Sequence, residues 1–131
     1  VEDQSTMIIG ARDSSGQRSY LAQASSGNSS IGVSSSLLVD VDIVAGDDYL
    51  LFGVHSGSTR LLSTNGSVKS DYLGSDPNNT IQGYSVGALN TAGTNGAFMD
   101  GTLAEVIVYN SDQSDNRVAI ETNINNQYNI Y

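Results

Sequence analysis

Hydrophobic and polar residues alternate with a period of two along much of this chain, a pattern typical of β-strands that bury one face. Leu37–Val44 is the clearest example, because Asp40 and Asp42 share one face of a strand while the other face is apolar, with Leu37, Val39, Val41 and Ile43. Similar patterns predict further strands at Thr6–Ala11, Ser19–Ala24, Ile31–Val33, Tyr49–Val54, Thr59–Ser63, Val68–Asp71 and Tyr84–Leu89. Polar turns that contain glycine separate the first three of these strands, so we expect a meander of hairpins.

The polar stretches between the predicted strands predict two kinds of connection, a tight hairpin turn and longer exposed loops. Asn65-Gly66 stands between two strand-like runs, and Asn-Gly in that position predicts a two-residue hairpin turn. Asp76–Asn79 holds the only proline and Asn90–Gly96 is rich in Gly, Asn and Thr, so both are predicted to be exposed loops.

The stretch Gly101–Asn110 predicts a core strand. Its apolar residues follow one another almost without interruption, and most of them are β-branched or aromatic. Such a run is typical of a strand whose two faces are both covered. One covering layer must come from another part of the chain, and the helix predicted after this strand is a candidate for the other.

That helix is predicted from Ser114 to the C-terminus. Ser114 would serve as its N-cap, and Asp115 would place a negative charge in the first turn, where the helix dipole favours it. Apolar residues recur every four positions, at Ile120, Ile124 and Tyr128. A helix this short is marginal in water, so we expect this ladder to dock on the sheet. The opposite, polar face would carry Glu121, Asn123, Asn125 and Asn126.

These C-terminal residues carry a family resemblance. The run Asp100–Asn110, followed by Ser114-Asp115, Arg117, Ile120-Glu121 and Tyr128–Ile130, resembles the C-terminal signature of concanavalin A-like jelly-roll domains of the laminin G type. The chain departs from the usual signature at Gln113, where the family has leucine, at Asn116, where it has an acid, and at Ile124-Asn125, where it has Tyr-Leu.

The resemblance implies an all-β fold, an antiparallel jelly-roll β-sandwich with one C-terminal helix, in a single domain over residues 1–131. Domains of this type usually begin with a strand that carries a Phe-Asp-Gly motif, and that opening is absent here. The resemblance therefore covers roughly the C-terminal two thirds of the usual domain. We expect a compact variant, a neighbouring chain that completes the sheet, or an upstream segment.

Charge and composition limit the classes of partner and of metal site that we expect. With 5 Lys and Arg against 14 Asp and Glu, the formal net charge is -9. This field repels phosphate backbones, anionic membrane surfaces and sulfated glycans, so neither nucleic acid nor a membrane is an expected partner. No stretch is long and apolar enough for a membrane helix. Cysteine is absent and His55 is the only histidine, so we expect no cofactor and no thiolate or histidine-rich metal site.

The sequence favours a protein without catalytic residues. Retaining glucanases of the concanavalin A-like fold resemble one another in a strand that carries several acids on one face. Here only Asp40 and Asp42 share a face, with Leu38 and Val44 at the next positions and no Glu, and there is no Trp to stack on sugar. A glycoside hydrolase-like domain acting on β-glucan is kept as the alternative. His55 with one of the many serines gives no nucleophile motif.

Neutral-glycan binding is the stronger hypothesis for a ligand. Sugars are held by polar side chains and backbone groups of loops, together with an aromatic ring. The candidate ligand-binding residues lie in predicted loops or at strand ends: Tyr72, Asn78, Asn79, Tyr84, Asn95 and Asp100. Loop carboxylates such as Asp47, Asp48 and Asp100 are possible calcium donors, but their spacing matches no known calcium loop, so no metal site is assigned.

The third hypothesis is structural. Strands rich in Ser, Thr, Asn and Gly, few charges, and the absence of an initiating strand resemble bacteriophage and bacterial surface proteins that carry this type of domain. We therefore expect a non-catalytic, surface-exposed attachment or decoration module at an extracellular or virion surface. Its expected partners are polysaccharide or glycan and neighbouring protein chains of an assembly.

Overall fold

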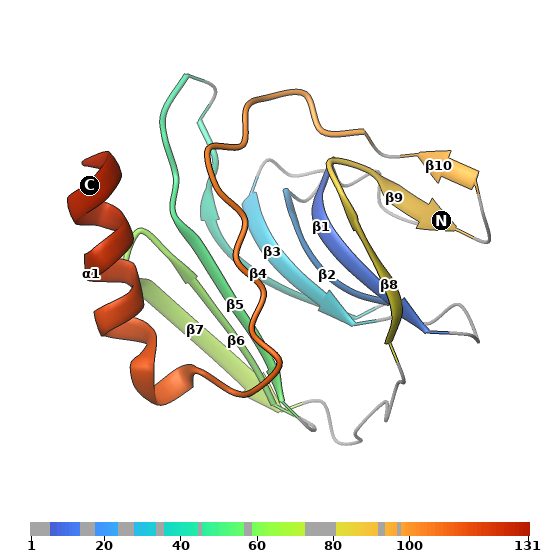
Figure 1. The fold of residues 1–131 in the computed structure, drawn as a ribbon, viewed down its shortest axis with the longest axis horizontal. Coiled ribbons are helices and arrows are strands. Elements are labelled where there is room, and N and C mark those ends of the chain that lie inside the picture. Colours follow the sequence, from blue (N-terminus) through green and yellow to red (C-terminus); the bar gives the residue numbers. More distant parts are fainter. Residues whose placement is uncertain are drawn as a thin grey trace.

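A computed structural model of the chain describes residues 6–13, 18–23, 28–33, 36–44, 46–56, 59–72, 81–91, 94–96 and 98–131. Figure 1 shows two main sheets, a short hairpin and one helix at the C-terminal end. The elements follow the order β1 (Thr6–Asp13), β2 (Arg18–Gln23), β3 (Asn28–Val33), β4 (Ser36–Asp42), β5 (Leu51–Ser56), β6 (Thr59–Thr64), β7 (Ser67–Tyr72), β8 (Ile81–Val86), β9 (Leu89–Thr91), β10 (Thr94–Gly96), η1 (Ser114–Asn116) and α1 (Arg117–Tyr128). The predicted all-β class with a C-terminal helix is confirmed.

The first sheet has five strands in the order β4-β3-β2-β1-β8, and all neighbouring pairs are antiparallel. The meander predicted for the first three strands is confirmed, because β1, β2 and β3 are neighbours both along the chain and in space, and β4 continues it. The chain then forms three strands of the other sheet before β8 returns to lie beside β1. Among the described strands, β4 and β8 are therefore the edges of this sheet.

The second sheet has three antiparallel strands in the order β5-β6-β7. Thr64 and Ser67 lie opposite each other, which leaves Asn65 and Gly66 as a two-residue turn. Both have positive φ, 48° at Asn65 and 80° at Gly66. Tight hairpin turns of the primed types need this backbone conformation, and Asn and Gly adopt it at low cost. The hairpin predicted from Asn-Gly is confirmed.

The two sheets pack against each other through the face of β6 that carries Leu62. Leu62 is fully buried and lies opposite Gly53 of β5. A Cβ atom at Gly53 would lie 3.1 Å from Ile31 Cδ1 of β3 and 3.4 Å from Leu21 Cδ1 of β2. Side chains of the five-stranded sheet therefore reach the backbone of β5, and a glycine there leaves room for them.

The helix occupies the other side of the three-stranded sheet. Figure 1 places α1 beside β5, β6 and β7, on the side away from the five-stranded sheet. Ser63 belongs to this outer face, since it neighbours Leu62 in β6, and it is fully buried. Ile120 and Ile124 are half-buried, whereas Tyr128 is 41% exposed. The predicted ladder is therefore covered at its first two positions and largely open at the third.

The start of the helix differs from the prediction in one respect. The Ser114 side chain does not cap a helix terminus. Instead, the Asp112 carboxylate accepts hydrogen bonds from the Ser114 hydroxyl and, at 2.9 Å, from the Ser114 backbone N–H. Asp115 lies in the first turn as expected. An Asp two residues earlier thus performs the role assigned to Ser114, because its carboxylate reaches forward to the first free N–H group.

The prediction that Glu121 lies on a polar face is wrong. Glu121 is only 3% exposed and forms an ion pair with Arg117, one turn earlier. Its other oxygen, Oε1, and the buried Ser63 Oγ have no hydrogen-bond partner among the described residues. A carboxylate is rarely buried without a charged partner. The Arg117-to-Glu121 spacing of four residues was the sequence signal that such a pair forms.

The prediction of a core strand at Gly101–Asn110 is also wrong. This segment pairs with no strand among the described residues, and each of its residues is exposed. Val106, Ile107 and Val108 are 40%, 46% and 50% exposed. β-Branched residues favour a pleated conformation, but a strand forms only where a neighbouring strand accepts its backbone hydrogen bonds.

One predicted loop contains regular structure. Asn90–Gly96 was expected to be a loop, yet β9 and β10 form a short antiparallel pair in which Asn95 lies opposite Asn90. A three-residue strand is too short for alternation to identify it.

Candidate functional site

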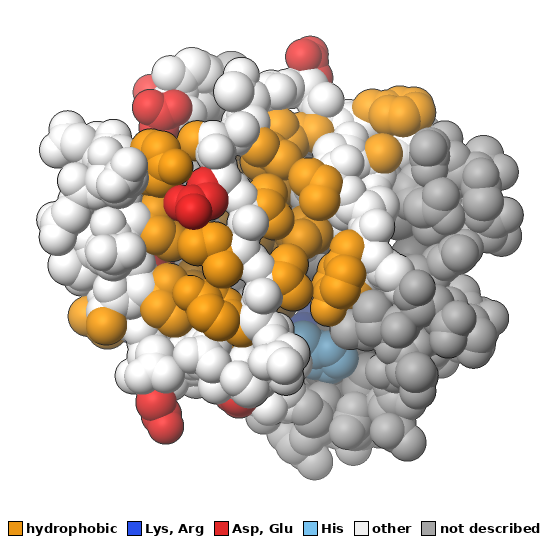
Figure 2. All heavy atoms as spheres, in the orientation of Figure 1, with side chains coloured by type: hydrophobic (Ala, Val, Ile, Leu, Met, Phe, Trp, Pro, Cys, Tyr) orange, Lys and Arg blue, Asp and Glu red, His pale blue; other side chains and the backbone are white. Residues whose placement is uncertain are grey.

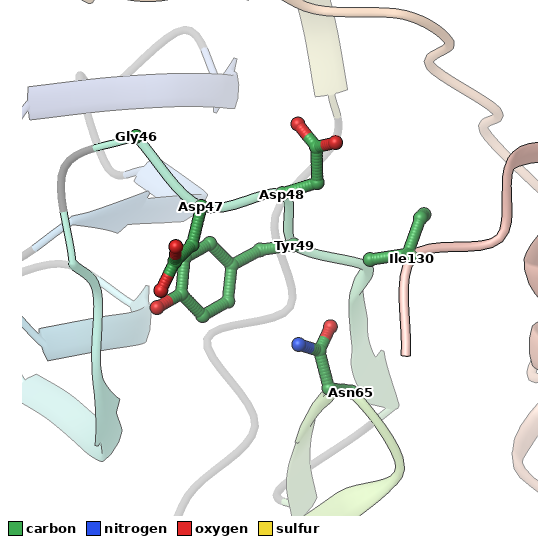
Figure 3. A pocket seen from close by; sticks show the side chains of 6 residues that line it. All are labelled: Gly46, Asp47, Asp48, Tyr49, Asn65 and Ile130. Carbon is green, nitrogen blue, oxygen red and sulfur yellow. The ribbon is translucent and has the colours of Figure 1, made fainter.

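A polar pocket lies where three segments of the chain meet at one end of the three-stranded sheet. Its lining residues are Gly46, Asp47, Asp48, Tyr49, Asn65 and Ile130, and its volume is about 390 Å³. Figure 3 shows the side chains of these residues around the cavity. The first four residues precede β5, Asn65 belongs to the β6–β7 turn, and Ile130 follows α1. The pocket is open to solvent.

The segment before β5 is held by Tyr49. The Tyr49 hydroxyl accepts a hydrogen bond of 2.9 Å from the Val44 backbone N–H, and the Asp47 N–H donates to the Val44 carbonyl at 3.3 Å. Gly46 has a φ of 98°, which a residue with a side chain rarely adopts. These contacts fold the chain back on itself, so that Asp47 and Asp48 are exposed at the pocket while Tyr49 is half-buried.

Asn65 joins this segment to the hairpin turn through two hydrogen bonds. Its Oδ1 accepts from the Leu50 N–H at 2.8 Å, and its own backbone N–H donates to the Leu50 carbonyl at 2.9 Å. Leu50 is 8% exposed, so its N–H needs a protein partner. Because Oδ1 is used in this bond, the amide nitrogen of Asn65 is left to face the cavity, and Figure 3 shows it on the Tyr49 side.

The C-terminal wall of the pocket is built by Asn125. Asn129 ends α1 in the left-handed conformation, and its N–H donates to the Asn125 carbonyl. The Asn125 side chain then accepts from the N–H groups of Ile130 and Tyr131, at 2.8 and 2.9 Å, and donates to the Tyr131 carbonyl. The last two residues are thereby tied back to the helix, which places Ile130 at the pocket.

Tyr131 packs beside the pocket, against the hairpin turn. A Cβ atom at Gly66 would lie 3.6 Å from the Tyr131 ring and from its hydroxyl oxygen. Partial burial and the nearby Glu121 carboxylate raise the pKa of Tyr131 above its usual value. This contact fixes the position of the C-terminal residues relative to Asn65.

The lining offers hydrogen-bond acceptors, one amide donor and apolar contact surface. Asp47 and Asp48 supply carboxylates, Asn65 supplies an NH₂ group, and Tyr49 and Ile130 supply apolar atoms. None of the described lining residues is Lys or Arg. Figure 3 shows that Asp47 and Asp48 point in different directions, so they do not form a carboxylate pair across one scissile bond. The arrangement suits binding of a polar, uncharged molecule.

The sequence-predicted ligand-binding residues lie elsewhere. Tyr72 ends β7, Tyr84 lies in β8 and is 54% exposed, Asn95 lies in β10, and Asp100 is exposed in the segment that follows β10. Asn78 and Asn79 fall outside the described residues. Thus the four described candidates belong to different parts of the fold, and none of them lines the pocket.

Sequence reasoning identified Asp47-Asp48 as an acidic turn and Asn65 as a turn residue, but it did not bring them together. Among the described residues, hydrogen bonds between Asn65 and Leu50, fifteen residues apart, bring them together. Asp40 and Asp42, the acids weighed for catalysis, both lie on β4, at an edge of the five-stranded sheet.

In the part of the chain that the structure describes, no group of three or more His, Cys, Asp and Glu side chains could hold a metal ion. The helices described there are too short or too polar to cross a membrane. Comparisons with protein-family models, curated proteins and solved structures find no match to this chain. The case for a function therefore rests on the residues and their geometry.

Replacement of Asn125 by alanine is expected to loosen the C-terminal wall of the pocket. The variant loses the three hydrogen bonds that hold Ile130 and Tyr131, so amide hydrogen exchange at these two residues should become faster. The free energy of unfolding should fall by about 1 kcal/mol, as is usual for partly exposed hydrogen bonds. The exposed neighbour Asn126→Ala serves as the control and should change neither quantity measurably. Unchanged exchange at Tyr131 in Asn125→Ala would contradict this role.

Proposed function

We propose that this chain is a non-catalytic attachment module that binds a neutral glycan in the pocket formed by Asp47, Asp48, Tyr49, Asn65 and Ile130. The observation that carries the proposal is the chemistry of the lining. Sugar hydroxyls donate hydrogen bonds to carboxylates and accept them from amide nitrogens, while the C–H faces of a sugar ring pack on aromatic and aliphatic groups. All three kinds of group line this cavity.

Charge supports a neutral ligand. The described lining residues include two carboxylates and no cationic side chain, and the chain has a net charge of -9. Sulfated, phosphorylated or uronic-acid sugars would be repelled at this position. The open shape of the pocket also suits a segment or end of a longer glycan better than a small molecule enclosed on all sides.

The proposal extends to the fold and its setting. We assign the two antiparallel sheets to an antiparallel jelly-roll β-sandwich of the concanavalin A-like, laminin G type. The return of β8 to the side of β1, after three strands in the other sheet, supports this assignment because it is a Greek-key type of connection. The low content of charged residues, 15%, supports a place at an extracellular or virion surface, within an assembly.

The test is a calorimetric titration of the whole chain with neutral hexasaccharides of glucose, mannose, galactose or xylose. At least one of these should bind. In the double variant Asp47→Ala with Asp48→Ala, the dissociation constant should rise at least ~10-fold, since hydrogen bonds to charged groups contribute about 1.5–3 kcal/mol. Asp115→Ala removes an exposed carboxylate of η1, away from the pocket, and should leave the affinity unchanged.

Two results would contradict the proposal. The first is that the double variant Tyr84→Ala with Asp100→Ala loses affinity while the Asp47 and Asp48 variant keeps it. The glycan would then bind at the candidates predicted from sequence and not in the pocket. Release of reducing sugar from a β-glucan, abolished by Asp40→Asn with Asp42→Asn, would establish the glycoside hydrolase alternative.

A further inference from the structure

The segment Gly101–Asn110 presents a row of backbone groups that have no backbone partner among the residues that the structure describes. Among the described residues, none of its N–H or C=O groups forms a hydrogen bond with another backbone group. Polar backbone groups in this state are bound to water, as they are along the open side of an edge strand. A polypeptide strand is the ligand that matches such a row, because its own N–H and C=O groups recur at the same spacing.

Both ends of this segment are anchored to the two sheets. Before it, the Met99 N–H donates to the carbonyl of Gly87, just after β8, at 2.8 Å. After it, Asp112 accepts hydrogen bonds from Ser114, and these bonds, together with the nearby side chain of Ser56, the last residue of β5, lower the pKa of its carboxyl group. Among the described strands, β8 and β5 are edge strands of their sheets. The segment therefore crosses from the edge of one sheet to the edge of the other.

The side chains of the segment are of the types found in strands that are buried on both faces. Val106, Ile107, Val108 and Tyr109 are β-branched or aromatic, and each is at least 40% exposed. Successive side chains of a strand point to opposite faces, so this run offers apolar contacts on both. Figure 2 shows apolar side chains across this face of the molecule, with a carboxylate among them. Tyr84 and Val86 of β8 and Phe98 add to the exposed apolar residues.

We propose that Gly101–Asn110 is a strand acceptor, which pairs through its backbone with an extended, basic segment of another polypeptide. Pairing would satisfy the backbone groups of the segment and cover its apolar side chains in the same step. The segment lies between the edge strands β8 and β5, so a strand added to it would also cover surface between the two sheets. This site is independent of the glycan pocket.

Charge selects the class of partner. Residues 98–116 contain Asp100, Glu105, Asp112 and Asp115, and no Lys or Arg. Like charges on neighbouring strands are destabilising, and opposite charges are favourable. Two copies of this chain, each with a net charge of -9, repel each other. A strand that alternates apolar residues with Lys or Arg complements both the exposed apolar side chains and the negative charge of the segment.

The probe is the fluorescein-labelled peptide Lys-Val-Thr-Val-Lys-Val-Thr-Val-Lys, added to the whole chain. We expect saturable binding by fluorescence anisotropy and a slowing of amide hydrogen exchange, at least ~10-fold, within residues 103–109. The double variant Val106→Pro with Val108→Pro removes two backbone donors and should abolish binding. Neither residue forms a hydrogen bond with a backbone group of the described residues, so the variant should keep its fold, which circular dichroism checks. Val106→Thr with Val108→Thr keeps both donors and a β-branched shape, and should still bind.

Several results would overturn this inference. These are slow hydrogen exchange at residues 103–109 in the free chain, equal binding by the proline and threonine variants, equal binding of a peptide with Glu in place of each Lys, or no binding of the Lys peptide at millimolar concentration. A dimer in size-exclusion chromatography with light scattering that the proline variant abolishes would show that a second copy, not a basic strand, occupies the segment.

Discussion

Leu62→Ala is expected to lower the free energy of unfolding by about 2–5 kcal/mol, because it leaves a cavity between the two sheets. Leu62 is fully buried, and its cross-strand neighbour Gly53 lies against Ile31 of the other sheet. Such a loss is a large part of the stability of an ordinary domain, about 5–15 kcal/mol. Urea denaturation followed by circular dichroism measures the difference.

The matched control is Leu103→Ala. Leu103 lies in the unpaired segment and is 37% exposed, so its truncation should cost less than about 1 kcal/mol. If Leu62→Ala and Leu103→Ala had equal effects, the packing of the two sheets through β6 would be refuted.

Ile120→Asp is expected to destabilise the protein by about 2–4 kcal/mol, because it places a carboxylate without a cationic partner in the contact between α1 and the sheet. Ile120 is half-buried, and the neighbouring Glu121 already holds Arg117 in an ion pair. Thermal and urea unfolding would report the change.

Val118→Asp provides the control on the same helix. Val118 is 62% exposed, and an acid in the first turn of α1 is favoured by the helix dipole. This variant should stay within about 0.5 kcal/mol of the parent chain. An unchanged melting temperature in Ile120→Asp would mean that this face of the helix is not docked.

Those features of the fold that depend on a few neighbouring residues were predictable from the sequence. Alternation of apolar and polar residues located the strands of the meander, and Asn65-Gly66 located a hairpin because few other residues adopt positive φ. The helix followed from its acidic first turn and its apolar spacing. Its capping residue did not, because Ser114 and Asp112 both have suitable side chains and only geometry decides between them.

Features that depend on distant residues were not predictable. Gly101–Asn110 has strong β propensity, but whether it joins a sheet depends on a neighbouring strand, which its own sequence does not specify. Glu121 is a charged residue of a type usually found at the surface, and it is buried because it forms an ion pair with Arg117. In both cases tertiary contacts, which the local pattern does not specify, determined the outcome.

The candidate site also depends on contacts between residues that are distant in the sequence. The acidic turn Asp47-Asp48 is visible in the sequence, yet a pocket arises only because Asn65 binds Leu50 and Asn125 holds Ile130 in place. These contacts join residues from three separate segments. The candidates Tyr72, Tyr84, Asn95 and Asp100 were chosen for residue type and expected exposure, and neither property specifies that side chains converge.

The most direct test of the glycan-binding account is a nuclear magnetic resonance titration of the isotopically labelled chain with the tightest-binding neutral hexasaccharide. The account predicts that the largest shifts occur at the backbone amides of Asp47, Asp48 and Tyr49 and at the side-chain amide of Asn65. Shifts centred on Tyr84, Asn95 and Asp100, or no shift with any neutral glycan at millimolar concentration, would contradict it.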